Sequence, residues 1–308
     1  MVPIHEIANF LAATLRTAAP IMICATGLVF SARAGIINIS AEGMMLIGAV
    51  TAVIGSQLSG SAWIGLLLAV VCTMLVALVF AFFTITLHAD QTVVGMGINV
   101  FGLGMSTTLS RFFFRSDLQG ARIDSFLPVQ IPVLSEIPIL GRALFSQTVP
   151  VYIILVFIPI AYFVMYKTDL GLRIRAVGEH PKACDTVGIN VYRIRCGTIL
   201  YSGALAGFAG TFVSLGAVSF FAENMVAGRG FMAVAAVIFG GYNPLGVLGA
   251  SMIFGAGEAL MFRLQTAGTQ IPFQFLLMIP YAITILAICG LVGKVQVPAA
   301  TGRPYYKE

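Results

Sequence analysis

The sequence predicts an all-α fold, a polytopic transmembrane bundle of about eight to ten helices. Of the 308 residues, 59% are hydrophobic and only 9% are charged, whereas about a quarter of a soluble domain is charged. Seven apolar stretches without a charged side chain reach the length of about 20 residues that a helix needs to cross the bilayer core. They are 43–63, 62–87, 91–110, 143–166, 196–222, 230–257 and 264–293. Their length excludes an outer-membrane barrel, whose strands are about half as long.

The distribution of basic residues predicts the orientation. The segment 167–195 carries six lysines and arginines between two predicted spans, which places it in the cytoplasm by the positive-inside rule. The proline-rich connection 113–147 balances its basic and acidic residues, and we place it outside. The net charge is +5, but the basic residues lie beside membrane spans. The charge therefore does not indicate nucleic-acid binding.

These two anchors predict nine crossings, an outside N-terminus and a single transmembrane domain over 1–308. The crossings are 7–30, 43–60, 62–87, 92–112, 148–166, 196–221, 229–242, 244–262 and 272–292. The span 229–242 is short, and 35–43 is too polar to face lipid. Each of these places is predicted to be a half-helix or re-entrant turn, which is tolerated only where protein or water surrounds it.

Polar residues interrupt the apolar runs in 27–48, notably Asn38 and Glu42. A carboxylate costs several kcal/mol in hydrocarbon, so Glu42 must face a loop, a cavity or a partner. Two interpretations stay open. Glu42 is either a charge in the first turn of a helix capped by Ser40, or part of a broken helix that faces a translocation path.

Two further polar residues lie within predicted spans. Glu258 lies in the glycine-rich stretch 227–260, and an acid on an apolar span indicates a functional site by default. The glycines themselves are also explained by close helix packing. Asn99 is a weaker candidate, since one amide in a bundle often makes only an interhelical hydrogen bond. Arg16, in the first span, can snorkel to the interface.

The cytoplasmic stretch 170–195 predicts turn, helix and turn, because glycines 171, 178 and 188 flank a short helix opened by Pro181. Such a knob can dock in a partner's groove, although a solvated loop that only fixes topology is the alternative. We expect no metal and no cofactor, because the histidines and cysteines lack ligand spacing. No catalytic constellation is present, so we expect no enzyme.

Three motifs resemble the permease subunits of bacterial ABC importers of the nucleoside and simple-sugar group. The pattern R-A-G-x-x-N-I-x-x-E-G-M-M of the nucleoside arm is similar to residues 33–45. The segment RAVGENPxAAxxxGI resembles 175–189, with His180 and Cys184 where Asn and Ala are usual. The third pattern, GRGFxAxAxxIFGxxNPLG, is similar to 228–246.

This resemblance implies a type II ABC importer-like architecture with broken or half-helices, in the cell inner membrane. It implies three protein partners: a cytoplasmic ABC ATPase, a paralogous permease in a heterodimer, and an extracytoplasmic solute-binding protein docked on 113–147 with 222–229. The solute would pass near Asn38, Glu42, Asn99 and Glu258. The residues expected to couple the chain to the ATPase are Arg173, Arg175, Gly178, Glu179, Pro181, Lys182 and Gly188.

The expected function is therefore ATP-driven import of nucleosides or related small polar solutes. A simple sugar, a riboflavin-like molecule or a branched-chain amino acid fits the same architecture. A more distant alternative is an ion-coupled secondary transporter, which would not need the segment 173–189 and would work without ATP.

Overall fold

The structure is a computed structural model that describes residues 4–114, 123–130, 144–267, 272–280, 282–283, 285 and 296–306. Its long helices are α1 (Ile4–Arg33), α2 (Ala41–Ser59), α3 (Ala62–Ala81), α4 (Gln91–Phe113), α6 (Val149–Lys167), α9 (Val191–Thr211) and α11 (Pro244–Thr266). The shorter ones are α7 (Asp169–Glu179), α8 (Pro181–Thr186), α10 (Arg229–Phe239) and α12 (Phe273–Leu277). The π-helices η1 (Phe82–Thr86) and η3 (Phe212–Val218) continue α3 and α9.

The all-α bundle predicted from the sequence is confirmed. Within the described ranges, seven helices are long and apolar enough to cross a membrane. The seventh predicted crossing, 229–242, contains only the 11-residue helix α10, as its shortness suggested. Of the ninth, 272–292, the structure describes 272–280, 282–283 and 285, which include the short helix α12. The sequence did not predict two short antiparallel strands, β1 (Pro128–Gln130) and β2 (Ser146–Thr148).

The least exposed helices form the centre of the bundle. In α1, α2 and α9 the most apolar windows are 83%, 89% and 72% buried, against 28% in both α3 and α4. Helix α9 packs against α1, α2 and α3, and α1 also packs along α11. The outer helices therefore keep large apolar side chains on the surface, which is the arrangement that a lipid environment stabilises.

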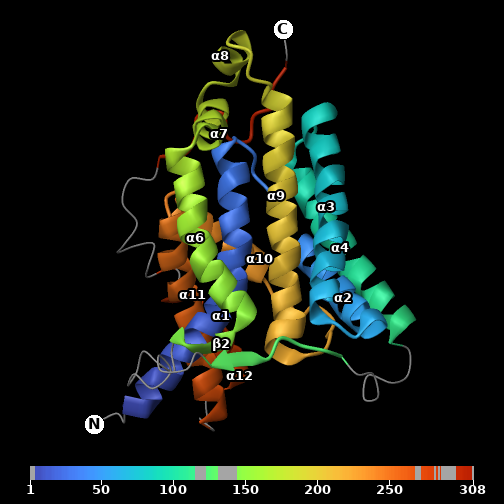
Figure 1. Cartoon of the computed structure of the whole chain (residues 1–308), viewed down its shortest axis with the longest axis vertical. Helices are drawn as coiled ribbons and strands as arrows, with labels where there is room; N and C mark the ends of the chain where they lie inside the picture. Colours follow the sequence, from blue (N-terminus) through green and yellow to red (C-terminus); the bar gives the residue numbers. More distant parts are fainter. Residues whose placement is uncertain are drawn as a thin grey trace.

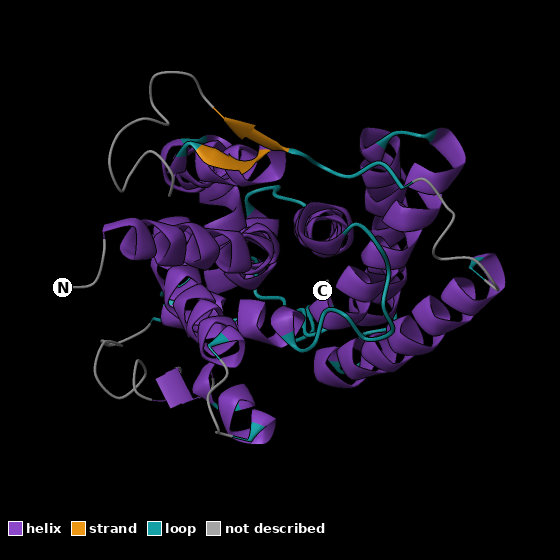
Figure 2. Cartoon of the chain, turned by 90° about the horizontal axis from the view of Figure 1, so that it is seen from below, coloured by secondary structure: helices purple, strands orange, loops and turns teal. Residues whose placement is uncertain are grey.

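The two ends of the bundle carry different segments (Figure 1). Helices α7 and α8 and the C-terminus lie at one end, and the N-terminus and the strands lie at the other. Seen from the N-terminal end, β1 and β2 run along one edge of the molecule (Figure 2). The described parts of 113–147 and 167–195 are therefore at opposite ends, as the charge distribution predicted.

Local sequence explains where several helices begin. Asp90 precedes α4 and accepts hydrogen bonds from the amides of Thr92 and Val93 at 2.8 and 3.0 Å. Asn190 accepts from the Arg193 amide, 2.9 Å away, at the start of α9. These side chains satisfy amides that the first turn of a helix leaves without a partner.

The cytoplasmic stretch differs from the predicted turn, helix and turn. Helix α8 (Pro181–Thr186) confirms the short helix after Pro181, and Gly188 has a φ of +84° in the turn that follows. Residues 169–179, however, form helix α7. Gly171 and Gly178 lie inside this helix. Glycine is needed at both positions because neighbouring backbone approaches too closely for a side chain, so the prediction of turns there was wrong.

Candidate functional site

The bundle contains a break in its helices at the segment 34–40. Helix α1 ends at Arg33, the next seven residues are not helical, and α2 begins at Ala41 inside the protein. Residues of this segment are buried or half-buried. The prediction that this polar stretch does not face lipid is confirmed, since surrounding helices cover it and supply its hydrogen bonds.

Glu42 joins the starts of two helices. It lies in the first turn of α2, and its carboxylate accepts hydrogen bonds from the amides of Gly228 and Gly230, 2.8 and 2.7 Å away, at the start of α10. Both helix N-termini favour a negative charge at this place. A Cβ on Gly230 would lie 2.5 Å from the Cα of Glu42, so only glycine allows this approach.

Two asparagines hold the non-helical segment in place. Asn99 on α4 accepts from the Gly43 amide, 2.8 Å away, and donates to the Ile39 carbonyl, 3.0 Å away. Asn38 donates to the hydroxyl of Ser202 on α9, 2.9 Å away, and accepts from Ser40. The predicted residues Asn38, Glu42 and Asn99 therefore converge on one site, where their polar atoms bond within the chain.

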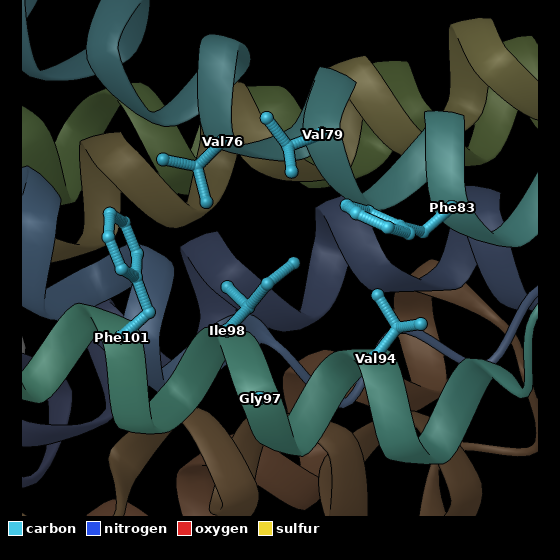
Figure 3. Close-up of a pocket in the computed structure, with 7 residues that line it drawn as sticks. All are labelled: Val76, Val79, Phe83, Val94, Gly97, Ile98 and Phe101. Atoms are coloured by element: carbon cyan, nitrogen blue, oxygen red, sulfur yellow. The ribbon is translucent and has the colours of Figure 1, made fainter.

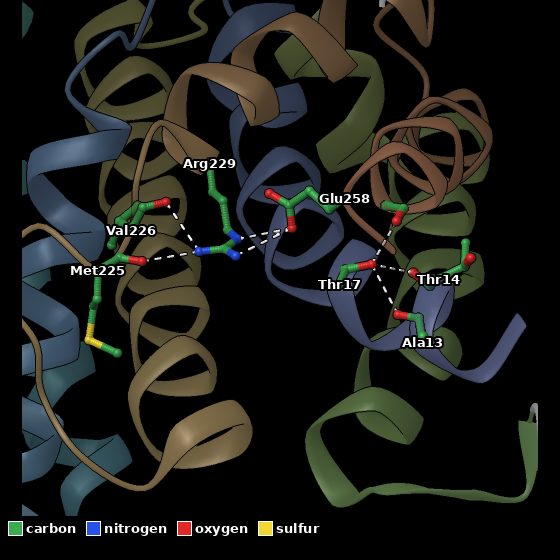
Figure 4. A network of polar contacts seen from close by, with 8 residues as sticks. Ala13, Thr14, Thr17, Met225, Val226, Arg229 and Glu258 are labelled. Carbon is green, nitrogen blue, oxygen red and sulfur yellow. Dashed lines mark hydrogen bonds and ion pairs between the residues drawn. The ribbon is translucent and has the colours of Figure 1, made fainter. Parts of the chain in front are cut away.

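Glu258 lies on the other side of α10, on α11, and pairs with Arg229 (Figure 4). Both Nε and one terminal nitrogen of Arg229 lie 3.3 Å from the same oxygen of Glu258. The other terminal nitrogen donates to the Met225 carbonyl, 3.0 Å away. Arg229 is the first residue of α10, so this ion pair and Glu42 fix the same helix start from two sides.

Helix α7 sits directly on the end of α1. The Cα of Gly178 approaches the α1 terminus so closely that a Cβ there would overlap the Arg33 carbonyl oxygen and lie 2.9 Å from its carbon. Arg33 in turn donates to the carbonyls of Tyr242 and Gly241, 2.7 and 3.2 Å away, at the end of α10. Helix α7 therefore contacts the end of α1, and Arg33 of α1 in turn contacts the residues that follow α10.

The residues predicted to couple with an ATPase divide by exposure. Arg173, Glu179, Lys182 and Gly188 are exposed at this end of the bundle, and Pro181 is half-buried. Arg175 is half-buried and stacks on the Tyr166 ring, 5.1 Å from its centre. Gly178 is buried against α1. The exposed members share this surface with the apolar side chains Leu170, Leu172 and Val187.

The contacts of the C-terminal tail, residues 296–306, were not predicted from the sequence. The Ala300 amide donates to the Gly178 carbonyl, 2.9 Å away, and the Gly302 amide donates to the Gly35 carbonyl, 3.0 Å away. Tyr305 packs in an apolar cluster with Val177, Cys184 and Val191. Burial in this cluster raises the pKa of the Cys184 thiol. The tail thus ties α7 to the non-helical segment, and no periodicity in its sequence indicated this.

At the opposite end, the described part of the predicted docking surface is continuous with the end of α9. The Phe126 amide donates to the Leu215 carbonyl of η3, 3.0 Å away. Arg111 and Glu223 form an exposed ion pair, with nitrogen and oxygen 3.0 Å apart. Residues 123–130 and 222–229 are therefore available on the same end of the molecule.

A groove of about 390 Å³ lies between α3 and α4 (Figure 3). Its lining residues are Val76, Val79, Phe83, Val94, Gly97, Ile98 and Phe101. None of these side chains can form a hydrogen bond, so the groove offers nothing to orient a polar solute.

Comparison with known proteins finds a matching family model and similar permease proteins. A family described as "Branched-chain amino acid transport system / permease component" matches residues 10–288. The chain is 39% identical to the guanosine ABC transporter permease protein NupQ of Bacillus subtilis (strain 168), over 96% of this chain and 95% of that protein. It is 36% identical to the nucleoside ABC transporter permease protein NupC of Lactococcus lactis subsp. cremoris (strain MG1363), over 94% of both.

Two further comparisons show lower similarity. The putative glucose ABC transporter permease protein TsgC13 of Haloferax volcanii is 31% identical over 98% of both chains. Among solved structures, an inward-facing putative metal-chelate type ABC transporter matches with a TM-score of 0.47 and 14% identity, covering 92% of this chain and 85% of that one.

Proposed function

Because the chain belongs to this family of transport-system permease components, we propose that it is the membrane subunit of an ATP-driven importer of nucleosides. It is a multi-pass protein of the inner membrane. The assignment of nucleosides as the substrate is supported by the similarity of this chain to guanosine and nucleoside permeases along nearly the whole length of both chains. The glucose permease is also similar, at lower identity, so a simple sugar is the second candidate.

The two ends of the bundle would bind different partners. The ATPase would dock on α7 and α8, where Arg173, Glu179 and Lys182 offer charge beside exposed leucines. A solute-binding protein would dock at the opposite end, on the surface that includes 123–130 and 222–229. A second, paralogous permease would complete the path across the membrane. Each partner would drive transport only by binding one state of the bundle better than the other.

The predicted path residues would act through the backbone that they hold. Asn38, Glu42 and Asn99 already use their polar atoms within the chain, so they would border the path by fixing the starts of α2 and α10. Arg33 connects the far end of α10 to α1 and α7. Closure of an ATPase against α7 would thus shift α10, whose start bears Glu42 on one side and Glu258 on the other.

The proposal is tested by uptake into proteoliposomes that contain this chain with its ATPase, second permease and binding protein. Labelled guanosine, uridine, ribose, riboflavin and leucine are supplied separately, with ATP or a non-hydrolysable analogue inside. We expect guanosine or uridine to accumulate only with ATP. Accumulation of ribose instead would establish the second candidate, and accumulation without ATP would point to a secondary transporter.

A further inference from the structure

A cavity of about 380 Å³ lies between α1, η3 and the start of α10. Its lining includes Arg16 and Pro20 of α1, Phe212 and Phe220, Arg229, and Phe262 of α11. We call it the arginine cavity. Its volume lies within the range of about 300–1,000 Å³ that is usual for small-molecule sites, and its lining, unlike that of the groove in Figure 3, combines aromatic rings with cations.

Arg16 is a cation on the membrane-crossing helix α1. It lies seventeen residues before Arg33, a distance of about 26 Å along a helix, and α1 is packed on α7 at Arg33. Its side chain is exposed, and across the described part of the chain its guanidinium forms no hydrogen bond or ion pair. At about 26 Å along a hydrocarbon core about 30 Å thick, this charge lies toward the interface opposite α7, where water, a ligand or a partner can stabilise it. An Arg16 side chain that extends toward the interface still lines this cavity.

The second arginine of the cavity has its charge balanced. The guanidinium of Arg229 pairs with Glu258 and donates to the carbonyls of Met225 and Val226 (Figure 4). This network also fixes the orientation of Arg229 on the cavity wall. Arg16 is therefore the uncompensated donor group among the described lining residues.

Pro20 lies one turn after Arg16 and also lines the cavity. Proline has no N–H, so the helical hydrogen bond that residue 20 would donate to the Arg16 carbonyl cannot form. The Arg16 guanidinium offers five donor N–H groups, so a ligand with hydrogen-bond acceptors on one edge matches it.

The aromatic side chains define the rest of the ligand. Phe212 is almost fully buried in the wall, whereas Phe220 and Phe262 remain 46% and 43% exposed. Phenyl faces and guanidinium planes both stack on flat heteroaromatic rings. A pentose has no flat ring to stack, and an α-ammonium group would be repelled by Arg16. The lining therefore favours a planar nitrogen heterocycle with carbonyl groups on its edge.

The wall on the side of η3 is adaptable. A π-helix such as η3 (Phe212–Val218), with hydrogen bonds between residues five apart, is rare. Where π-helices occur, they are often at functional sites. Directly after it, Ser219, Asn224 and Ala227 have φ angles of +62°, +56° and +51°. Non-glycine residues in this conformation are strained and cluster where segments clamp ligands or switch.

We propose that the arginine cavity binds the base of a nucleoside during transport, with Arg16 as the residue that recognises the edge of the base. This inference rests on the proposed function and assigns the substrate contact to α1, η3 and α10. It differs from the predicted contacts at Asn38, Glu42 and Asn99, whose polar atoms bond within the chain.

The test uses 8-azidoguanosine as a photoaffinity probe on the assembled transporter in proteoliposomes. In the wild type we expect adducts on peptides containing 212–229 or 258–262, displaced by guanosine and not by ribose. Arg16→Ala should reduce labelling at a subsaturating probe concentration by about tenfold or more, the effect of losing a hydrogen bond from a charged group. Arg16→Lys, which keeps the charge without the planar fork, should lie between. Arg263→Ala, which removes an exposed cation on α11 outside the cavity, should label like the wild type.

The outcomes separate the two proposals. If the wild type imports guanosine while Arg16→Ala labels and transports within twofold of it, the cavity assignment is overturned and the proposed function stands. If Arg16→Ala prevents assembly with the second permease, Arg16 pairs with that subunit, and the assignment is again overturned. If the wild type neither labels with the probe nor imports nucleosides, the proposed function itself fails.

Discussion

A single methyl group at position 178 is expected to separate helix α7 from the bundle. In Gly178→Ala the new Cβ would overlap the Arg33 carbonyl oxygen, and it would lie 2.9 Å from the carbonyl carbon and 3.3 Å from the Gly35 amide nitrogen. Contacts under 3.0 Å essentially never occur for real Cβ atoms. These neighbours are backbone, so α7 has to move as a unit, and overpacking of this kind costs about 1–3 kcal/mol.

The matched control is Gly197→Ala on α9, where the added Cβ meets nothing within 4 Å. Alanine in a helix is more stable than glycine by about 0.5–1 kcal/mol, so this variant should be as stable as the wild type or more so. The two alanine variants should therefore differ by roughly 1.5–4 kcal/mol, or about 3 °C or more in the thermal midpoint.

The assay compares ATP-driven guanosine uptake with ATP hydrolysis by the assembled transporter in proteoliposomes. We expect Gly178→Ala to lose at least about 90% of uptake, since a shift near 1 Å at a coupling contact can cost about two orders of magnitude. ATP hydrolysis should fall less than uptake, because the shift breaks transmission to α1 and not the ATPase. Equal midpoints and equal uptake in the two alanine variants would refute the close approach of α7 to α1.

Three other variants test contacts of the site. Glu42→Gln keeps the shape of the side chain but turns an NH₂ donor toward the backbone N–H of Gly228 or Gly230, where the carboxylate accepts a hydrogen bond. The thermal midpoint in detergent should therefore fall by the equivalent of about 1–3 kcal/mol. An unchanged midpoint would show that these bonds do not stabilise the fold. Gly230→Ala should destabilise similarly, whereas Gly104→Ala, with open space around its Cβ, should not; equal effects would contradict the packing of α10 on α2. Tyr305→Ala should speed maleimide labelling of Cys184, with the other cysteines replaced. Burial raises the pKa of the Cys184 thiol, so little thiolate is present at neutral pH and labelling of the intact protein should rise steeply with pH above neutral; labelling that does not depend on the tail would exclude this contact.

The membrane spans were predictable because they depend on composition over about 20 residues. A run such as 148–166 has to cross the bilayer as a helix whatever its neighbours are, and α6 (Val149–Lys167) follows it closely. The polar stretch 35–43 was predictable for the same reason, since hydrocarbon cannot solvate it. The break between α1 and α2 is its structural consequence.

Within the coupling segment the sequence misled at the glycines. A glycine is favoured both in turns and where two backbones meet, and the pattern around 171 and 178 does not distinguish them. Proximity of α7 to the end of α1 decides the matter. The predicted roles of Arg173, Glu179 and Lys182 stay predictions, since their exposure is compatible with an ATPase contact but does not test it.

The sequence by itself determined that this protein is a bundle of transmembrane helices, which of its segments are too polar for lipid, and which motifs resemble nucleoside permeases. These properties follow from local composition and order. Only the tertiary structure decided which polar groups meet: Glu42 with the start of α10, Arg229 with Glu258, and the tail with α7. Hydrogen bonds and ion pairs need atoms within about 3 Å, and residues as far apart in the sequence as Glu42 and Gly230, 188 positions, are brought to that distance only by helix packing.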